Sequence, residues 1–266
     1  MKSNVSSFPN RTLIDKTMSD VVVVTGGTKG IGRAITEAFV SQGYHVIVGA
    51  RASNSIQDLN PQKITFKSID VRHPESHEEL ALLASGVGNR LVAWINNAGL
   101  SAWRPIELID EEFFDQLMGV NLRSAFWGCK QAARLMELTG GSIINISSIA
   151  GKRGSANNSM YCATKFGMNG LTQSLAKELG PKGINVNAIC PVLVKTDGLI
   201  EALQTEHSPA KGHPEIFLND FTKLNSANGA LPKPNDVANL AVYLAHRQNK
   251  AITGQCINVD CGVFPQ

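Results

Sequence analysis

The chain has 266 residues, of which 43% are hydrophobic and 18% charged, which is enough to bury a full core in a single domain. The net charge of +3 is mild and the lysines and arginines are scattered, so neither feature suggests a nucleic-acid partner. The five cysteines have no spacing suited to zinc, and no apolar run is long enough to cross a membrane. We therefore expect a cytoplasmic protein with reduced thiols and no bound metal.

An alternation of strands and helices begins at Val21. Residues 1–20 are polar and lack the apolar stretch of a signal peptide, so we interpret them as a loosely ordered extension before a domain at 21–266. Seven β-branched runs are predicted strands, at 21–27, 45–50, 63–70, 91–97, 142–148, 184–190 and 255–260. Helices are predicted at 30–42, 75–84, 111–138, 158–179 and 235–246. This pattern indicates an α/β fold, a single Rossmann-type, doubly wound domain whose seven-stranded parallel sheet is flanked by helices.

Two connections depart from this alternation. Residues 51–62 are barely enough for a crossover, so we expect a short or irregular helix there. Residues 197–234 are polar and rich in Pro, Gly and Asn, which predicts an irregular lid or binding segment. Gly180 and Pro181 are predicted to end the helix at 158–179, and Asn235 to cap the last helix.

A glycine-rich turn follows the first predicted strand, in "VVVVTGGTKGIGRA". Gly26, Gly30 and Gly32 allow positive φ and let a diphosphate approach the amide groups of a helix N-terminus. A turn without a ligand would use the same residues. The position after the first strand of a strand–helix alternation favours dinucleotide binding.

Cofactor choice is predicted from the end of the second strand, where an acidic residue would bind the ribose hydroxyl of NAD. Here the strand ends in "VGARAS", which places Arg51 there and no carboxylate. Lys29, inside the glycine turn, supplies a second cation. The pair predicts NADP(H), although each side chain alone is compatible with a solvated surface charge.

Tyr161 and Lys165 lie four residues apart in a predicted helix and so share a face. An adjacent ammonium stabilises a phenolate and lowers its pKa, which suits general acid/base work on an alcohol or ketone. The spacing also occurs by chance. Ser148, at the end of the fifth predicted strand, and Asn121, inside a predicted helix, add polar groups in places that favour a binding role.

With these residues in this order, the chain resembles the short-chain dehydrogenase/reductase family from Val21 to Val263. The resemblance is carried by "TGGTKGIG", "NNAG", "VNLRSAF", "ISS", "YCATK", "NAICP" and "ITGQCINVDCG". It implies an oxidoreductase that transfers hydride between NADP(H) and a ketone or secondary alcohol, in the style of 3-oxoacyl-thioester reductases and sugar or polyol dehydrogenases. The resemblance leaves a small polar, carbohydrate-like or acyl substrate open, and the polarity of the segment 197–234 favours a small polar or carbohydrate-like one.

The resemblance also implies roles for individual residues. Tyr161 would be the acid/base, Lys165 would lower its pKa and hold the nicotinamide ribose, Ser148 would bind the substrate oxygen, and Asn121 would hold a water. Asp70 would contact adenine, and Thr196 the carboxamide. The implied cofactor-binding residues are Gly26, Thr28, Lys29, Gly30, Ile31, Gly32, Arg51, Asp70, Val71, Asn97, Ala98, Gly99, Tyr161, Lys165, Pro191, Val194 and Thr196.

Two positions depart from the family pattern, in which glycines usually stand at Val192 and Cys261. The change at Val192 is expected to shift the backbone beside the nicotinamide, and Cys261 to lie at a subunit contact. Trp103 and Arg104, after "NNAG", are candidate substrate contacts, with packing and a surface ion pair as the respective alternatives. The family commonly forms tetramers through its two long central helices, so a homo-oligomer, tetramer or dimer, is expected.

Two other functions stay open from the sequence. One is a catalytically silent NADP(H)-binding sensor with the same fold. The presence of Asn121, Ser148, Tyr161 and Lys165 argues against this function. The other is an interaction protein in which the sheet is only a scaffold. A small-molecule substrate is favoured, with no nucleic acid and no membrane as partner.

Overall fold

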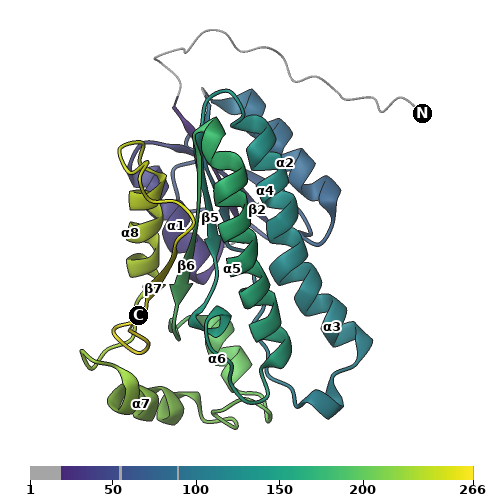
Figure 1. The fold of residues 1–266 in the computed structure, drawn as a ribbon, viewed down its shortest axis with the longest axis vertical. Helices are drawn as coiled ribbons and strands as arrows, with labels where there is room; N and C mark the ends of the chain where they lie inside the picture. The colour runs from purple at the N-terminus through teal and green to yellow at the C-terminus, as the bar shows by residue number, and fades with distance from the viewer. Residues whose placement is uncertain (1–18, 54–55, 89, 266) are drawn as a thin grey trace.

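A seven-stranded, all-parallel sheet forms the centre of the protein (Figure 1). The computed structural model describes residues 19–53, 56–88 and 90–265. Its strands are β1 (Val21–Thr25), β2 (His45–Ala50), β3 (Ile64–Ser68), β4 (Leu91–Asn96), β5 (Gly141–Ile146), β6 (Ile184–Pro191) and β7 (Cys256–Val259). Their order is β3-β2-β1-β4-β5-β6-β7, which reverses direction between β1 and β4. The predicted Rossmann-type fold is confirmed, and such a reversal is where these sheets bind ligands.

Helices cover both faces of this sheet. They are α1 (Gly30–Ser41), α2 (Pro74–Val87), α3 (Glu111–Leu117), α4 (Ser124–Leu135), α5 (Ser159–Leu179), α6 (Asp197–Leu203), α7 (Pro214–Asn225) and α8 (Pro234–Ala245). Short turns of 3-10 helix are η1 (Ile106–Leu108), η3 (Ile149–Gly151) and η4 (Gly180–Lys182). Helices α1 and α8 pack together on one face, while α2, α4 and α5 cover the other (Figure 1).

The two cores follow from the alternation of side chains along the strands. In β1, Val22 and Val24 belong to the core beneath α1 and α8, and Val21 and Val23 to the core beneath α2, α4 and α5. All five residues of β1 are buried, as a central strand covered on both faces requires. Most of the predicted extension lies outside the described residues, but Asp20 belongs to the domain because it pairs with Arg90 at 2.8 Å.

The helix predicted at 111–138 is interrupted. A π-helical turn, η2 (Met118–Arg123), separates α3 from α4. Asn121 lies in this turn, and its side chain accepts a hydrogen bond from the Leu100 amide at 2.7 Å and donates one to the Leu100 carbonyl at 2.9 Å. Such a turn inserts a residue into a helix and is frequent at functional sites. Helical periodicity does not register a single inserted residue, so the sequence predicted a continuous helix.

The segment 197–234 is less irregular than predicted, because it contains α6 and α7. Thr196 caps α6 by accepting a hydrogen bond from the Leu199 amide at 3.3 Å. The predicted cap at Asn235 is wrong: the N-cap of α8 is Lys233, whose amide donates to the Asp236 carboxylate at 2.7 Å. A proline at the first position favours this start. One other prediction is confirmed, since α5 ends before Gly180. The short or irregular helix expected between β2 and β3 is not found, because the described residues there form only turns and bends.

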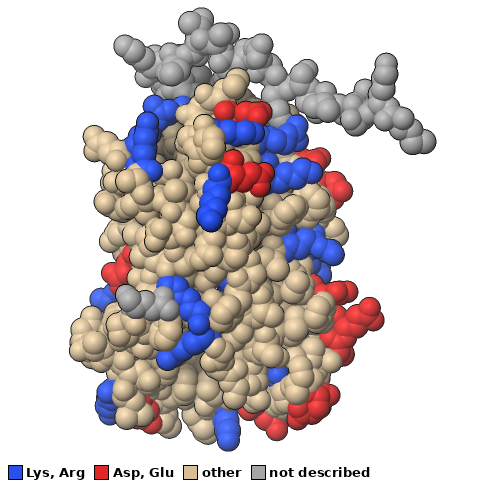
Figure 2. All heavy atoms as spheres, in the orientation of Figure 1, with Lys and Arg blue, Asp and Glu red and all other residues tan. Residues whose placement is uncertain are grey.

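The surface carries charges of both signs, and the cysteines are unpaired. The face drawn in Figure 2 carries both signs of charge, interspersed over a mostly uncharged surface. Across the described residues, no helix is long and apolar enough to span a bilayer, and no group of three or more candidate ligands could hold a metal ion. All five cysteines are free thiols.

A chain of buried polar side chains joins β4, β5 and α5. The Trp94 indole donates to Asn96, whose amide donates to Asn145 at 2.8 Å. Asn145 in turn donates to the Thr172 hydroxyl of α5 at 2.9 Å. Helix α4 approaches these polar side chains closely at Gly128, where an added Cβ would lie 2.0 Å from the side-chain oxygen Oδ1 of Asn96.

We predict that Gly128→Ala destabilises the protein by about 1–3 kcal/mol, because the methyl group forces apart a closely packed helix and strand. Gly86→Ala is the matched control, since nothing lies within 4 Å of its added Cβ and alanine favours the helix. Urea unfolding of the two variants measures the difference. Equal stability of Gly128→Ala and the unsubstituted protein would contradict the close approach.

Candidate active site

The glycine turn between β1 and α1 is built by close backbone approach. Gly26 and Gly30 have φ of 66° and 52°, a region that favours glycine. A Cβ at Gly32 would lie 2.1 Å from the Gly26 carbonyl oxygen, so no larger residue fits. The N-cap of α1, Lys29, makes no side-chain cap hydrogen bond. The turn therefore presents helix amides to an anionic group, and its lack of side chains fits a diphosphate.

Asn97, directly after β4, holds this turn in place. Its side-chain amide donates to the carbonyl oxygens of Thr25 at 3.0 Å and Gly26 at 3.1 Å. Its backbone amide donates to the Thr25 hydroxyl at 3.1 Å. Asn97 lines the cavity, as predicted, and its amide group also joins the ends of β1 and β4.

The far end of the site contains one ion pair and two unpaired cations. Arg72 pairs with Asp70 at 2.6 Å, and its hydrogen bonds lower the pKa of the Asp70 carboxyl to about 2. Within the described residues, the Arg51 guanidinium and the Lys29 ammonium have no ion pair or hydrogen bond. Both line the same cavity as the glycine turn. This pair of free cations fits an additional phosphate on the cofactor.

Helix α5 brings Tyr161 and Lys165 to the carboxyl end of β5. Lys165 is 3% exposed, and its ammonium donates to the Ile146 carbonyl at 2.8 Å. Burial lowers the pKa of Lys165 to about 8. Its nitrogen lies 5.6 Å from the centroid of the Tyr161 ring, on the shared face that the spacing predicted.

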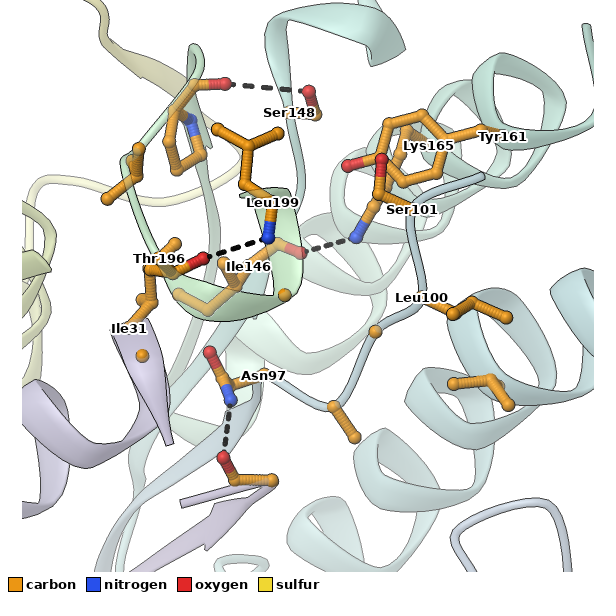
Figure 3. Close-up of a pocket in the computed structure, with 18 of the residues that line it drawn as sticks. Ile31, Asn97, Leu100, Ser101, Ile146, Ser148, Tyr161, Lys165, Thr196 and Leu199 are labelled. Atoms are coloured by element: carbon orange, nitrogen blue, oxygen red, sulfur yellow. Dashed lines mark hydrogen bonds between the residues drawn. The ribbon is translucent and has the colours of Figure 1, made fainter. Parts of the chain in front are cut away.

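The Tyr161 phenol and the Ser148 hydroxyl line the cavity together with this lysine, and the Ser148 hydroxyl donates to the Pro191 carbonyl at 3.5 Å (Figure 3). Ile146 is the register partner of Ile189, so Ser148 and Pro191 emerge side by side from β5 and β6. Burial raises the pKa of Tyr161 to about 12, against a hydrogen bond with Ser148 that lowers it. The expected lowering by Lys165 is not found in this structure, because the ammonium turns to the Ile146 carbonyl. Tyr161 is therefore protonated at neutral pH.

Asn121 does not line the cavity. It is fully buried, and its amide also donates to the Thr164 hydroxyl of α5 at 3.2 Å. A Cβ added at Gly99 would lie 3.6 Å from the side-chain oxygen Oδ1 of Asn121 and 3.7 Å from the ammonium nitrogen Nζ of Lys165. Asn121 and Lys165 therefore converge on the same glycine.

A cavity of about 830 Å³ joins all of these parts (Figure 3). Of the predicted site residues it is lined by Gly26, Thr28, Lys29, Gly30, Ile31, Gly32, Arg51, Asp70, Val71, Asn97, Ala98, Gly99, Trp103, Ser148, Tyr161, Lys165, Pro191, Val194 and Thr196. Arg104 is outside this lining, because its guanidinium pairs with Asp110 at 3.1 Å and stacks on Phe113. The ion-pair alternative therefore holds for Arg104, whereas Trp103 both packs in a small core and lines the cavity.

The sequence missed many of the residues that line the cavity, among them Arg72, Leu199, Phe217 and Phe221. Arg72 stands two residues after Asp70, a spacing that could have signalled the ion pair. Leu199, Phe217 and Phe221 come from α6 and α7, where no helix was predicted. A helical pattern in "PEIFLNDF" would have placed both phenylalanines on one face.

The two departures from the family pattern have different consequences. Val192 is not among the described residues with positive φ, and it packs in a buried cluster with Ile149 and Val263. Valine therefore fits here without strain. Cys261 has a φ of 53°, the left-handed conformation that glycine adopts without cost. The subunit contact predicted at Cys261 stays a prediction.

Comparison with known proteins now identifies the family. Residues 20–207 match the family model described as short chain dehydrogenase. The chain belongs to the short-chain dehydrogenase family. It is 35% identical over 260 residues to L-2,3-butanediol dehydrogenase of Corynebacterium glutamicum, a match that covers 93% of this chain and 99% of that protein.

Other short-chain dehydrogenase relatives agree with this assignment. The (S)-acetoin-forming diacetyl reductase of Staphylococcus aureus is 35% identical over 255 residues, covering 93% of this chain and 98% of that protein. A crystal structure of a tryptophan variant of actinorhodin polyketide ketoreductase with NADPH has a TM-score of 0.85 and 28% identity, covering 92% of this chain and 97% of that chain. The protein is thus an oxidoreductase of the type that acts on CH–OH groups with a nicotinamide cofactor.

We predict that the buried Lys165 makes the stability of the protein depend on pH. Its pKa falls from about 10.5 when unfolded to about 8 when folded, so the unfolded state binds more protons between these values. Stability relative to Lys165→Met should therefore rise from pH 8 to pH 10.5, by an amount on the order of 2–3 kcal/mol. Urea unfolding of both proteins across this range is the measurement. A difference that stays constant with pH would show that the lysine is not desolvated.

Proposed function

We propose that the protein is an NADP(H)-dependent reductase of ketones, working in reverse as a dehydrogenase of secondary alcohols. The observation that carries the proposal is that the Ser148 and Tyr161 hydroxyls and the buried Lys165 line one cavity with the glycine turn. Two hydroxyls can bind a single carbonyl oxygen and supply its proton. Membership of the short-chain dehydrogenase family supports the same reaction.

In the proposed reaction, each residue handles the substrate oxygen or its proton. Tyr161, protonated because its pKa is raised to about 12, donates the proton to the carbonyl oxygen during reduction. Ser148 donates a hydrogen bond to the same oxygen as negative charge develops there. Lys165 orients the nicotinamide ribose, and Asn121 holds a water behind it. When bound, the nicotinamide supplies or accepts the hydride.

The proposed preference for NADP(H) rests on charge. Arg51 and Lys29 line the cavity with no partner in the described part of the chain, and no carboxylate stands at the end of β2. Two cations without a counter-ion favour the additional ribose phosphate of NADP(H). Asp70 is held by Arg72 at 2.6 Å, so this pair would form the adenine end of the site.

The substrate is proposed to carry its carbonyl on an apolar framework. The relatives named for diacetyl and 2,3-butanediol suggest a vicinal diketone, hydroxyketone or diol. The lining of the cavity includes the apolar side chains of Val192, Leu199, Phe217 and Phe221, alongside polar ones such as Arg153, Ser155 and Asn158. We favour the apolar framework over the carbohydrate-like substrate suggested by the composition of 197–234, because the relatives are named for a small diketone and a small diol.

We propose a cytoplasmic homo-oligomer, tetramer or dimer. Phe114, Phe126 and Phe166, on α3, α4 and α5, are 45%, 47% and 47% exposed, and a second copy of the chain would cover them. The five free thiols suit a reducing compartment. The mixed charges of Figure 2 offer no basic surface to nucleic acid on that face.

We predict that Tyr161→Phe lowers turnover of ketones by about 10²–10⁴-fold, because the proton donor is lost. NADPH binding, followed by nicotinamide fluorescence, should change little. Tyr243→Phe is the matched control, because this tyrosine is 52% exposed on α8 and outside the cavity. Full activity of Tyr161→Phe would overturn the catalytic assignment. Tight NADPH binding by a protein that reduces no ketone would favour the silent sensor.

We predict that the unsubstituted protein binds NADPH roughly 10–100-fold more tightly than NADH, through charge-assisted hydrogen bonds to the extra phosphate. Arg51→Ala together with Lys29→Ala should remove this preference and leave NADH affinity unchanged. Lys250→Ala, an exposed change outside the cavity, is the control. Calorimetric titration of both cofactors measures the effect. Equal affinities in the unsubstituted protein would sink the phosphate assignment.

A further inference from the structure

Three aromatic side chains from outside the glycine turn line the cavity. We call Trp103, Phe217 and Phe221 the aromatic wall. Phe217 and Phe221 are one turn apart on α7, with ring centroids 5.8 Å apart and planes tilted by 43°. Trp103 comes from the loop after β4, and all three residues line the same cavity as Ser148 and Tyr161.

The aromatic wall is held by packing that leaves ring surface free. Leu218, 4% exposed, anchors α7 to Leu203 and Trp103. Phe217 packs at the edge of this cluster. Phe221 packs at the edge of another cluster that contains Ile149, the residue directly after Ser148. The aromatic wall therefore continues from Trp103 to the immediate neighbourhood of the catalytic serine.

The two phenylalanine rings are only half-buried, although they lie in a cavity. Apolar surface in this position gains free energy when a ligand covers it. Aromatic rings pair best with other rings, in offset or edge-to-face arrangements. Leu199, which projects into the cavity near Ser148 in Figure 3, adds a further apolar contact. Charged residues, among them Arg153, Asp197 and Glu201, line other parts of the same cavity.

We infer that the substrate is an aryl ketone, with its carbonyl at Ser148 and Tyr161 and its aromatic ring against the aromatic wall. This inference rests on the proposed function and specifies its substrate class. One relative is named as a diacetyl reductase. In the substrate that we infer, an aryl group replaces one of the two methyl groups of such a diketone. Straight-chain or saturated-ring ketones have the same apolar character without the ring pairing, so they are the competing outcomes.

The test compares butane-2,3-dione, 1-phenylpropane-1,2-dione and 1-cyclohexylpropane-1,2-dione as substrates with NADPH. We expect kcat/KM for the phenyl compound to exceed that for butane-2,3-dione by about tenfold or more. It should exceed that for the cyclohexyl compound, which matches it in size, by roughly threefold to tenfold. Equal values for the phenyl and cyclohexyl compounds, or the highest value for butane-2,3-dione, would overturn the inference.

Variants of the aromatic wall give the second arm. Phe217→Leu and Phe221→Leu keep the apolar character but remove the ring, so the ratio of phenyl to cyclohexyl kcat/KM should fall toward one. Ile216→Ala on the same helix, 63% exposed and outside the cavity lining, should leave the ratio unchanged. A thermal melt of each variant verifies folding. An unchanged ratio in both leucine variants would overturn the role of the rings.

A binding measurement separates this inference from the proposed function. Calorimetry with NADP⁺, which cannot reduce a ketone, should show tighter binding of the phenyl compound than of the other two, and loss of this preference in the leucine variants. Turnover without the phenyl preference would overturn the aryl inference and leave the reductase standing. Phenyl-selective binding without turnover would overturn the proposed reaction and retain the ring site.

Discussion

The position of α5 against the end of β5 is the constraint on which the rest of the site depends. The Lys165 ammonium is buried and bonds the Ile146 carbonyl at 2.8 Å, and the Ser147 hydroxyl returns a bond to the Lys165 carbonyl at 3.4 Å. Asn169 adds a bond to the Gly151 carbonyl. A buried ammonium without a partner is costly, so these bonds oppose sliding of the helix along the sheet. They hold Tyr161 beside Ser148.

Close backbone approach plays the equivalent role at the cofactor end. The turn at Gly26 and Gly32 admits no added Cβ at Gly32, and Asn97 joins it to the neighbouring strand. In the proposed site, backbone amides and a helix terminus would bind the diphosphate, and Arg51 and Lys29 would be the side-chain cations. The fold accepts Val192 in place of the family's glycine because the backbone at this position does not have a positive φ.

The sequence predicted much of the fold and of the cofactor site, and its failures have local physical causes. The strand–helix alternation produced the correct class because the central strands are β-branched runs that helices bury on both faces, while the edge strands β3 and β7 are partly exposed. The π-helical turn at Asn121 was missed because one inserted residue hardly changes helical periodicity. Helices α6 and α7 were missed because their polar composition and flanking glycines and prolines indicate a loop, whereas packing of Leu203 and Leu218 stabilises them.

The sequence by itself determined the order of strands and helices, the glycine turn, and the spacing that places Tyr161 and Lys165 on one helical face, because these depend on local geometry. Only the tertiary structure decided that Lys165 bonds the Ile146 carbonyl, that Arg72 pairs with Asp70, and that an aromatic wall lines the same cavity as Ser148 and Tyr161. Those contacts join segments that are distant in the chain or depend on side-chain orientation. Their formation is decided by packing, which periodicity does not encode.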